Sequence, residues 1–193
     1  GDPSALSEFD SKIYEKAAAV LDEIITDGMD DYEKELAVHD YIIYNVTYDE
    51  GSLSAIPNPA EHCDDPYGAL INGKAICKGY TTTFRMFMGM LSIPCGTVHS
   101  SDATGEEHAW NTVKLDGSWY YVDCTWDDPI PDSAARPVIH TYFNVSREEI
   151  ETDHVLPDGC PDTESAANSY YTRSAVKIAD LGEIYGAAKD ALA

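Results

Sequence analysis

The chain has 193 residues, enough to bury a sizeable core in one domain, and its 44% apolar content and 13 tyrosines favour a folded chain over a disordered one. Thirty-five acidic against 12 basic residues give a net charge of −23, which would repel nucleic-acid phosphates and anionic membrane surfaces. This charge leads us to expect no nucleic-acid partner. No apolar run is long enough to span a bilayer, so we also expect no membrane insertion.

The N-terminal part carries two helical patterns. Apolar residues recur at helical spacing over residues 7–25, ending near Gly28, and again from Asp31 to about Asn45. His39 lies inside the second of these helices, where we expect a structural role rather than a catalytic one. Residues 46–64 contain prolines and few periodic apolar residues, which predicts an irregular connection.

The stretch "GKAICKGYTTTF" places a cysteine at the start of a third helix, after "DDPYGAL", which predicts a short aspartate-capped helix. Cys77 lies three residues before Tyr80, so it opens the third helix on its buried face. The free amides and the positive dipole end of that helix favour the thiolate form of Cys77. Gly73 and Gly79 are expected to let backbone and substrate approach the sulfur. The apolar face is formed by Tyr80, Phe84, Phe87, Met88 and Leu91.

A hairpin follows a strand expected in "IPCGTVHSSD". The stretch "EEHAWNTVKLDGSWYYVDCTW" has β-rich runs on both sides of Asp116-Gly117, which predicts a two-residue turn. Such a turn pairs Leu115 with Ser118, and His108 and Asp123 then become diagonal neighbours within hydrogen-bonding reach. Four side chains share that face of the hairpin: His108, Trp110, Asp123 and Thr125.

The remaining segments are less regular. Residues 127–139 predict a proline-rich loop, "HTYFN" a further strand, and "SREE" a capping box that starts a short helix. We expect a single domain over residues 1–173, with helices in 7–45 and a core in 65–155, followed by a C-terminal helical segment over 174–193. The opening residues, "GDPSALSEFD", are typical of a chain that continues from an export signal or linker.

Five cysteines are an odd number, so at least one thiol stays free. Cys63 and Cys160, both in turn-rich segments, form the candidate disulfide, and two unpaired thiols are at least as good an interpretation. A zinc site built from Cys77, Cys95, His99 and Cys124 is disfavoured because the chain lacks CxxC and HxxxH spacings. We expect no metal ion and no cofactor.

A cysteine at a helix start and a strand histidine held by a carboxylate together form a thiol nucleophile system. Cys77 would attack a carbonyl carbon, His108 would stabilise the thiolate and protonate the leaving amine, and Asp123 would orient His108. Singly, each residue is more often structural, but the combination favours catalysis. Either water or an amine could resolve the acyl-thioester.

The blocks "DPYGALINGKAICKGYTTTF" and "GEEHAWNTVKLDGSWYYVDCTWDDP", and more loosely "HTYFNVSREEIETDH", resemble the transglutaminase-like superfamily of papain-like thiol enzymes, particularly its bacterial exported members. The close match covers residues 65–129. The resemblance implies an α+β fold in which N-terminal helices accompany a nucleophile helix packed on an antiparallel β-sheet.

The resemblance also assigns site residues. Cys77 matches the nucleophile, His108 the base and Asp123 the orienting acid. Trp110 matches the tryptophan that commonly follows the histidine in this family and would pack against the site. Trp110 and Trp126 are also expected to line the substrate cleft. An extracellular or cell-surface location and a peptide, protein or peptidoglycan-peptide substrate are implied as well.

Two features depart from the family pattern. The chain contains no glutamine, and all three tryptophans follow Cys77, so the upstream oxyanion residues of papain-type enzymes and animal transglutaminases are absent. The Cys77 amide is then the first oxyanion donor, and Tyr67 is the candidate second donor or, equally, a packing residue. Amide hydrolysis is therefore favoured over two alternatives, acyl transfer from protein glutamine to amines and a non-catalytic binding module on the same fold.

Overall fold

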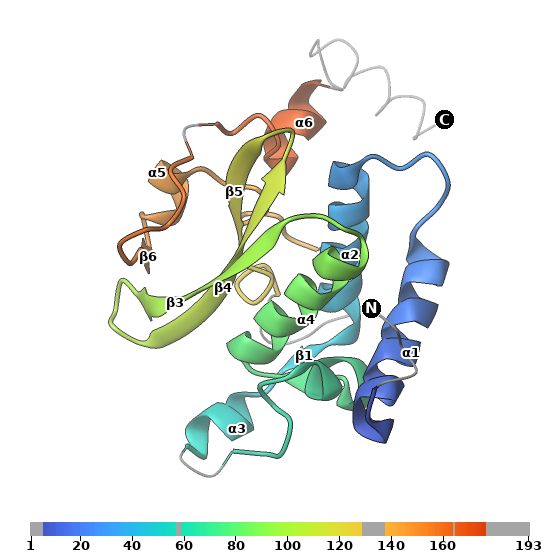
Figure 1. The fold of residues 1–193 in the computed structure, drawn as a ribbon. Coiled ribbons are helices and arrows are strands. Elements are labelled where there is room, and N and C mark those ends of the chain that lie inside the picture. The colour runs from blue at the N-terminus through green and yellow to red at the C-terminus, as the bar shows by residue number, and fades with distance from the viewer. Residues whose placement is uncertain (1–5, 57–58, 129–137, 164, 177–193) are drawn as a thin grey trace, which may run out of the picture.

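The structure is a computed structural model that describes residues 6–56, 59–128, 138–163 and 165–176. Helices gather beside a four-stranded antiparallel sheet of order β5-β4-β3-β6 (Figure 1). No described helix is long and apolar enough to cross a membrane. In chain order the elements are α1 (Glu8–Ile24), α2 (Asp31–Asn45), β1 (Thr47–Tyr48), α3 (Glu50–Ser54), the π-helix η2 (Gly68–Asn72), β2 (Lys74–Ala75), α4 (Cys77–Met90), β3 (Cys95–Asp102), β4 (Glu107–Leu115), β5 (Ser118–Val122), α5 (Arg147–Ile150), β6 (His154–Val155) and α6 (Tyr170–Val176).

The first two helices begin and end where the sequence pattern predicts. Ser7 caps α1 by accepting a hydrogen bond from the Asp10 amide, and Asp30 forms a capping box with Glu33 at the start of α2. Both helices place acidic residues in their first turns, which favours their positive dipole ends.

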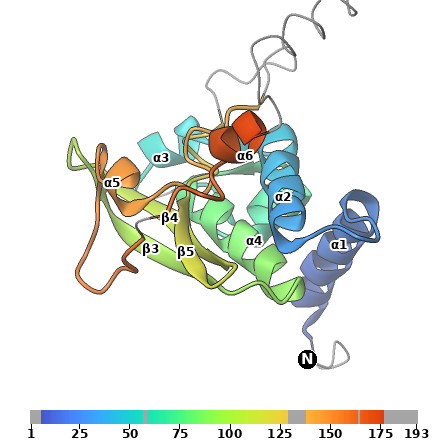
Figure 2. The same ribbon diagram turned by 90° about the horizontal axis from the view of Figure 1, so that it is seen from above.

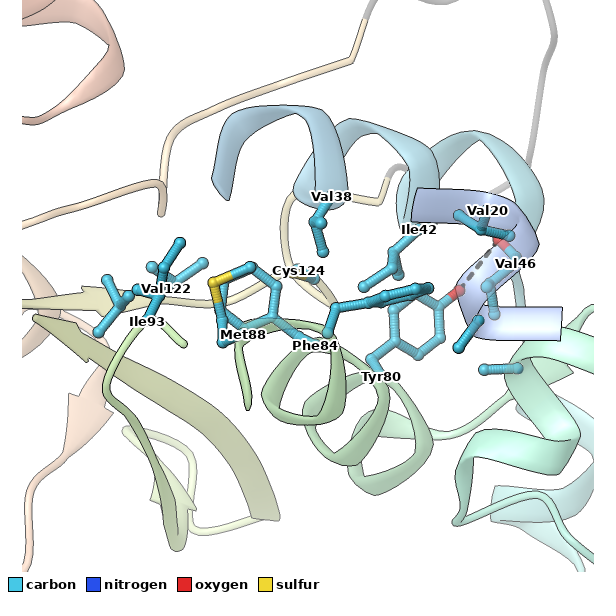
Figure 3. Close-up of a cluster of buried hydrophobic side chains, with 14 of the residues drawn as sticks. Val20, Val38, Ile42, Val46, Tyr80, Phe84, Met88, Ile93, Val122 and Cys124 are labelled. Atoms are coloured by element: carbon cyan, nitrogen blue, oxygen red, sulfur yellow. Dashed lines mark hydrogen bonds between the residues drawn. The ribbon is translucent and has the colours of Figure 1, made fainter. Parts of the chain in front are cut away.

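Helix α4 lies at the centre of the molecule. It packs on β3 and β4 on one side and on α2 on the other, and α1 lies beyond α2 (Figures 1 and 2). The predicted apolar face of α4 supplies side chains to the core between these layers, where Tyr80, Phe84 and Met88 meet residues of α2 and β5 (Figure 3). Tyr80, Phe84, Phe87 and Met88 are fully buried. Because this face buries so much apolar area, α4 is held firmly in place, and with it Cys77 at its first position.

The predicted hairpin register is confirmed. Leu115 pairs with Ser118, and the ladder continues to Asn111 and Val122. Asp116 and Gly117 have φ values of 50° and 85°, as a two-residue turn with both central residues in the left-handed region requires. This register fixes which side chains of β4 share a face with the residues that follow β5.

The connection over residues 46–64 is more ordered than predicted. Strand β1 pairs in parallel with β2, aligning Thr47 with Lys74 and Tyr48 with Ala75, and α3 follows directly. The "DDPYGAL" segment does have its aspartate cap, since Asp65 accepts from the amides of Tyr67 and Gly68, but it continues as a π-helix rather than an α-helix.

For the chain after β5, the structure confirms one expected element and contradicts another. "HTYFN" is not a strand: its described residues form turns, and only an isolated bridge between Tyr121 and Val145 follows. The capping box at Ser146 is confirmed and starts α5. The expected boundary between residues 173 and 174 falls within α6, while residues 129–137 of the expected loop and 177–193 of the expected C-terminal segment lie outside the described residues.

All five cysteines are free thiols, so Cys63 and Cys160 do not form a disulfide. Cys63 is buried beside the first turn of α4, where its carbonyl oxygen accepts the Ile76 amide. Cys160 instead packs against a second apolar cluster around Trp110 and Tyr121. Of the two interpretations left open by the sequence, the structure supports unpaired thiols.

Candidate active site

Cys77 is the first residue of α4 and is 9% exposed. The preceding residue, Ile76, has no side chain able to cap the helix, so the first amides of α4 receive no side-chain hydrogen bond from it. Gly79 serves packing rather than substrate approach, because a Cβ there would lie 2.6 Å from the Ala75 Cβ and 2.8 Å from the Cys63 carbonyl oxygen.

His108 lies on β4 and meets both other members of the predicted triad. Its Nε2 lies 2.6 Å from Asp123 Oδ2, and its side chain lines one hollow together with Cys77. Since Nε2 faces the carboxylate, Nδ1 is the nitrogen available to the sulfur. The sequence-predicted residues are therefore brought together in the order thiol, imidazole, carboxylate.

The charges within this set support one another. Burial lowers the pKa of His108, but hydrogen bonds with Asp123 and Cys77 outweigh it and raise the pKa to about 10. Burial raises the pKa of Asp123, yet hydrogen bonds from His108 and His154 lower it to about 2. His108 therefore stays protonated and Asp123 stays ionised at neutral pH.

Two polar contacts tether the helix that carries Cys77 to the strand that carries His108. Thr81 Oγ1 donates to the Ala109 carbonyl over 2.9 Å, and Asn111 Nδ2 donates to the Thr81 carbonyl over 3.2 Å. Both side chains are buried, so water competes little for these bonds. They fix the first turn of α4 relative to β4 and hence the sulfur relative to the imidazole.

Two adjoining hollows meet at His108, and one of them also includes Cys77. We call the first the acidic hollow, a space of about 460 Å³, and the second the thiol hollow, about 400 Å³. They share Leu53, Ile56, Glu107 and His108. The acidic hollow adds Tyr48, Asp102, Glu106, Thr125 and Trp126, and the thiol hollow adds Ile76, Cys77, Lys78, His99, Ser100 and Ala109.

The two tryptophans expected at the cleft have different positions. Trp126 lines the acidic hollow and stacks on His108, with ring centroids 5.4 Å apart. Trp110 does not line either hollow, contrary to expectation, because its side chain is fully buried. It packs beneath the site instead, 5.7 Å from the His108 ring and 4.7 Å from the His154 ring.

Tyr67 does not occupy the position expected of an oxyanion donor. Its hydroxyl accepts a hydrogen bond from Lys12 Nζ of α1 over 2.9 Å, and its ring stacks on Phe9. Neither hollow includes Tyr67. We therefore assign this residue to packing between α1 and η2, the other interpretation that the sequence allowed.

Sequence reasoning missed two residues that reach the site from short strands. His154 Nε2 on β6 donates to Asp123 Oδ2 over 3.0 Å, while its Nδ1 lies 2.7 Å from Asp153 Oδ1. Tyr48 on β1 lines the acidic hollow beside His108. The only sequence signal for His154 was its place at the end of the loosest matching block, and Tyr48 lay in a segment predicted to be irregular.

Two sets of described side chains have ligand-type atoms within 4.8 Å of one another, as a metal ion would require: His39, Asp40 and His140, and His108, Asp123 and His154. In the first set Asp40 Oδ1 lies 3.0 Å from His39 Nδ1 and 2.8 Å from His140 Nε2. In the second, one oxygen of Asp123 meets both rings at 2.6 and 3.0 Å. These separations are those of hydrogen bonds, so shared protons account for both sets.

A family model described as "Transglutaminase-like superfamily" matches residues 18–124, more than half of the chain. The Kyphoscoliosis peptidase of Homo sapiens is 28% identical over 141 residues, which cover 65% of this chain, and that of Mus musculus is 25% identical over 134 residues, which cover 64%. The matched part is 21% and 20% of the length of these two proteins, so the chain spans about a fifth of each.

A solved structure described as "Crystal structure of a TGase" is similar to this chain with a TM-score of 0.51 at 22% identity, over 69% of this chain and 36% of that chain. At this identity the likeness shows the fold. It agrees with the α+β class expected from the sequence, in which α4 packs on an antiparallel sheet.

Proposed function

The chain belongs to the transglutaminase-like superfamily, and from that premise we propose that it is a cysteine hydrolase that cleaves amide bonds in peptides, with Cys77, His108 and Asp123 as its catalytic residues. The observation that carries the proposal is the position of His108, which hydrogen-bonds with Asp123 through Nε2 and lines one hollow together with Cys77. Both ring nitrogens of His39 face carboxylates, whereas His108 shares its hollow with a thiol.

The proposed reaction has two stages. The Cys77 thiolate attacks the carbonyl carbon, a C–S bond forms, and the π electron pair moves to the carbonyl oxygen. The tetrahedral anion then collapses, the C–N bond breaks, and His108 gives its proton to the leaving amine. In the second stage His108 takes a proton from water, whose oxygen attacks the thioester and releases the acid and the Cys77 thiolate.

The charges of the site suit this sequence. A His108 pKa of about 10 keeps a proton ready for the leaving amine, and an Asp123 pKa of about 2 keeps the carboxylate charged. Cys77 lies at the positive end of α4, a position typical of reactive thiols.

The acidic hollow suggests the kind of peptide that binds. Leu53 and Ile56 are exposed apolar side chains on its rim, and Asp102, Glu106 and Glu107 add three carboxylates. No lysine or arginine stands among the described residues that line it. We propose that peptides with a lysine or arginine near the cleaved bond, including peptides of the cell wall outside the cytoplasm, are the preferred substrates.

The proposal is tested with a peptide library that varies lysine, arginine, glutamate and leucine on either side of the cleaved bond. Release of new amines is measured from pH 5 to 9. We expect cleavage of basic peptides, abolished by Cys77→Ala and unchanged by Cys160→Ala, a substitution of a thiol away from the site. A library that stays intact at every pH would overturn the proposal.

The same assay separates hydrolysis from transfer. A labelled alkylamine and a glutamine-bearing protein are added in parallel, and incorporation of the label is measured by mass spectrometry. We expect amine release without incorporation. Incorporation faster than hydrolysis would show that an amine, rather than water, resolves the thioester.

A further inference from the structure

Helix α4 begins with an amide that needs a partner. The backbone N–H of Cys77 is one of the first amides of the helix, which have no partner within it. Ile76 provides no side-chain cap, and the bonds to its carbonyl come from Gly79 and Tyr80 further along. A polar group from outside α4 is therefore required at this amide.

Tyr48 is held beside that position by the short parallel pair of strands. In this pair Tyr48 aligns with Ala75, two residues before Cys77, and the next amide, that of Asp49, donates to the Ala75 carbonyl over 2.9 Å. The Tyr48 ring lies 6.2 Å from the ring of Tyr80 in the first turn of α4. Its side chain also lines the acidic hollow together with His108, Thr125 and Trp126.

The phenol is in electrostatic contact with the nucleophile. Burial raises the pKa of Tyr48 to about 12, with the nearby charges of Cys77 and Asp123 acting in the same direction. The Cys77 backbone amide acts on the pKa of the phenol in the opposite direction. Tyr48 therefore keeps its proton across the working pH range and can donate it in a hydrogen bond.

We propose that Tyr48 is a catalytic residue, which together with the Cys77 amide forms the oxyanion hole of the site. The inference rests on the proposed thioester chemistry. When the Cys77 sulfur bonds to the carbonyl carbon, the electron pair that moves to oxygen meets two donors, the amide N–H at the start of α4 and the phenol O–H of Tyr48. Tyr48 keeps its proton throughout, and the pair returns to the carbonyl when the leaving group departs.

The experiment compares two reactions of the same sulfur. Acylation by p-nitrophenyl acetate passes through a tetrahedral oxyanion and releases nitrophenolate, which is followed by its absorbance. Alkylation by iodoacetamide displaces iodide at a saturated carbon and forms no oxyanion, so it reports only the reactivity and access of the thiolate. Both rates are measured in the parent, in Tyr48→Phe and in Tyr67→Phe, which removes a phenol outside the hollows. Cys77 is identified as the modified residue by peptide mass spectrometry.

We expect Tyr48→Phe to slow acylation roughly a hundredfold while alkylation changes less than about twofold. Tyr67→Phe should change neither rate. Unchanged acylation in Tyr48→Phe would overturn the assignment and leave the proposed function intact. Equal slowing of both reactions would also overturn it, because Tyr48 would then act on the thiolate itself. A parent Cys77 that neither reagent modifies would remove the proposed function together with this inference.

Discussion

At the scale of single residues, Asp123 is the most tightly held group of the site. One of its oxygens faces His108 and His154, and the other accepts the amides of Thr125 and Trp126 over 2.9 and 3.2 Å. Four contacts to one carboxylate strongly favour its charged form. A fixed, charged Asp123 is what keeps Nε2 of His108 turned away from the sulfur.

His154 is thus a positioning residue, and His154→Phe tests that role. The substitution keeps a ring against Trp126 but removes a hydrogen bond that lowers the pKa of Asp123. Because the pKa of Asp123 then rises, activity should disappear at a higher pH on the acid side, by about one pH unit or more. The kcat profile from pH 2 to 8 measures the shift.

The control for this prediction is His140→Phe, which alters another buried histidine that bonds to a carboxylate, Asp40, away from the hollows. This substitution should leave the acid side of the pH profile of kcat unchanged. An acid limb that His154→Phe does not move would show that this histidine only fills space.

At the scale of elements, α2 is joined to the segment after β5 by buried polar side chains. His39 is fully buried, with Nδ1 3.0 Å from Asp40 and Nε2 3.1 Å from Asp127, as the structural role expected of it requires. One turn earlier on α2, Glu35 is also fully buried and accepts a hydrogen bond from Asn144 Nδ2 over 2.9 Å. Its other oxygen has no hydrogen-bond partner among the described residues.

This arrangement makes Glu35 a source of pH-dependent instability. Burial raises its pKa from an ordinary value of 4.5 to about 8. Between these two pH values the folded chain holds a proton that the unfolded chain has released, so stability falls as the pH rises. Glu35→Gln keeps the shape and does not titrate. We expect it to increase the free energy of unfolding by about 2 kcal/mol or more at pH 8 and by much less at pH 5.

Urea unfolding at the two pH values measures this difference. The same substitution at the exposed Glu23 of α1 is the control and should have equal effects at both. If the gain from Glu35→Gln is the same at pH 5 and pH 8, Glu35 does not hold a proton in the folded state.

At the scale of the whole molecule, the site is assembled from segments far apart in the chain, and this determined what the sequence could predict. The contact of His108 with Asp123 follows from a local hairpin whose turn residues, Asp116 and Gly117, fix the register. The start of α4 at Cys77 follows from the spacing of its buried face. That α4 packs on β4 is a long-range fact, which the family resemblance implied and periodicity could not.

Two residues of the site were not predicted from the sequence, because their positions depend on strand pairings that leave no local sequence pattern. Tyr48 and His154 lie on strands of two residues, too short to show an alternating pattern, and each strand pairs with a distant segment. The same limit explains "HTYFN", whose β-rich composition suits a strand although its described residues form turns. Tyr67 was a candidate donor because it lies shortly upstream of Cys77 in a matching block, with packing as an equal interpretation, and its hydroxyl in fact faces Lys12.

The central claim is that His108 holds the Cys77 sulfur as a reactive thiolate, and the most direct test is the rate of Cys77 alkylation by iodoacetamide from pH 5 to 9. The rate is read by peptide mass spectrometry in the parent and in His108→Ala, with N-acetylcysteine as the free-thiol reference. We predict that Cys77 in the parent reacts at pH 5 far faster than the reference, and that His108→Ala slows it at least about tenfold. Labelling no faster than the reference, or equal in both proteins, would contradict the account.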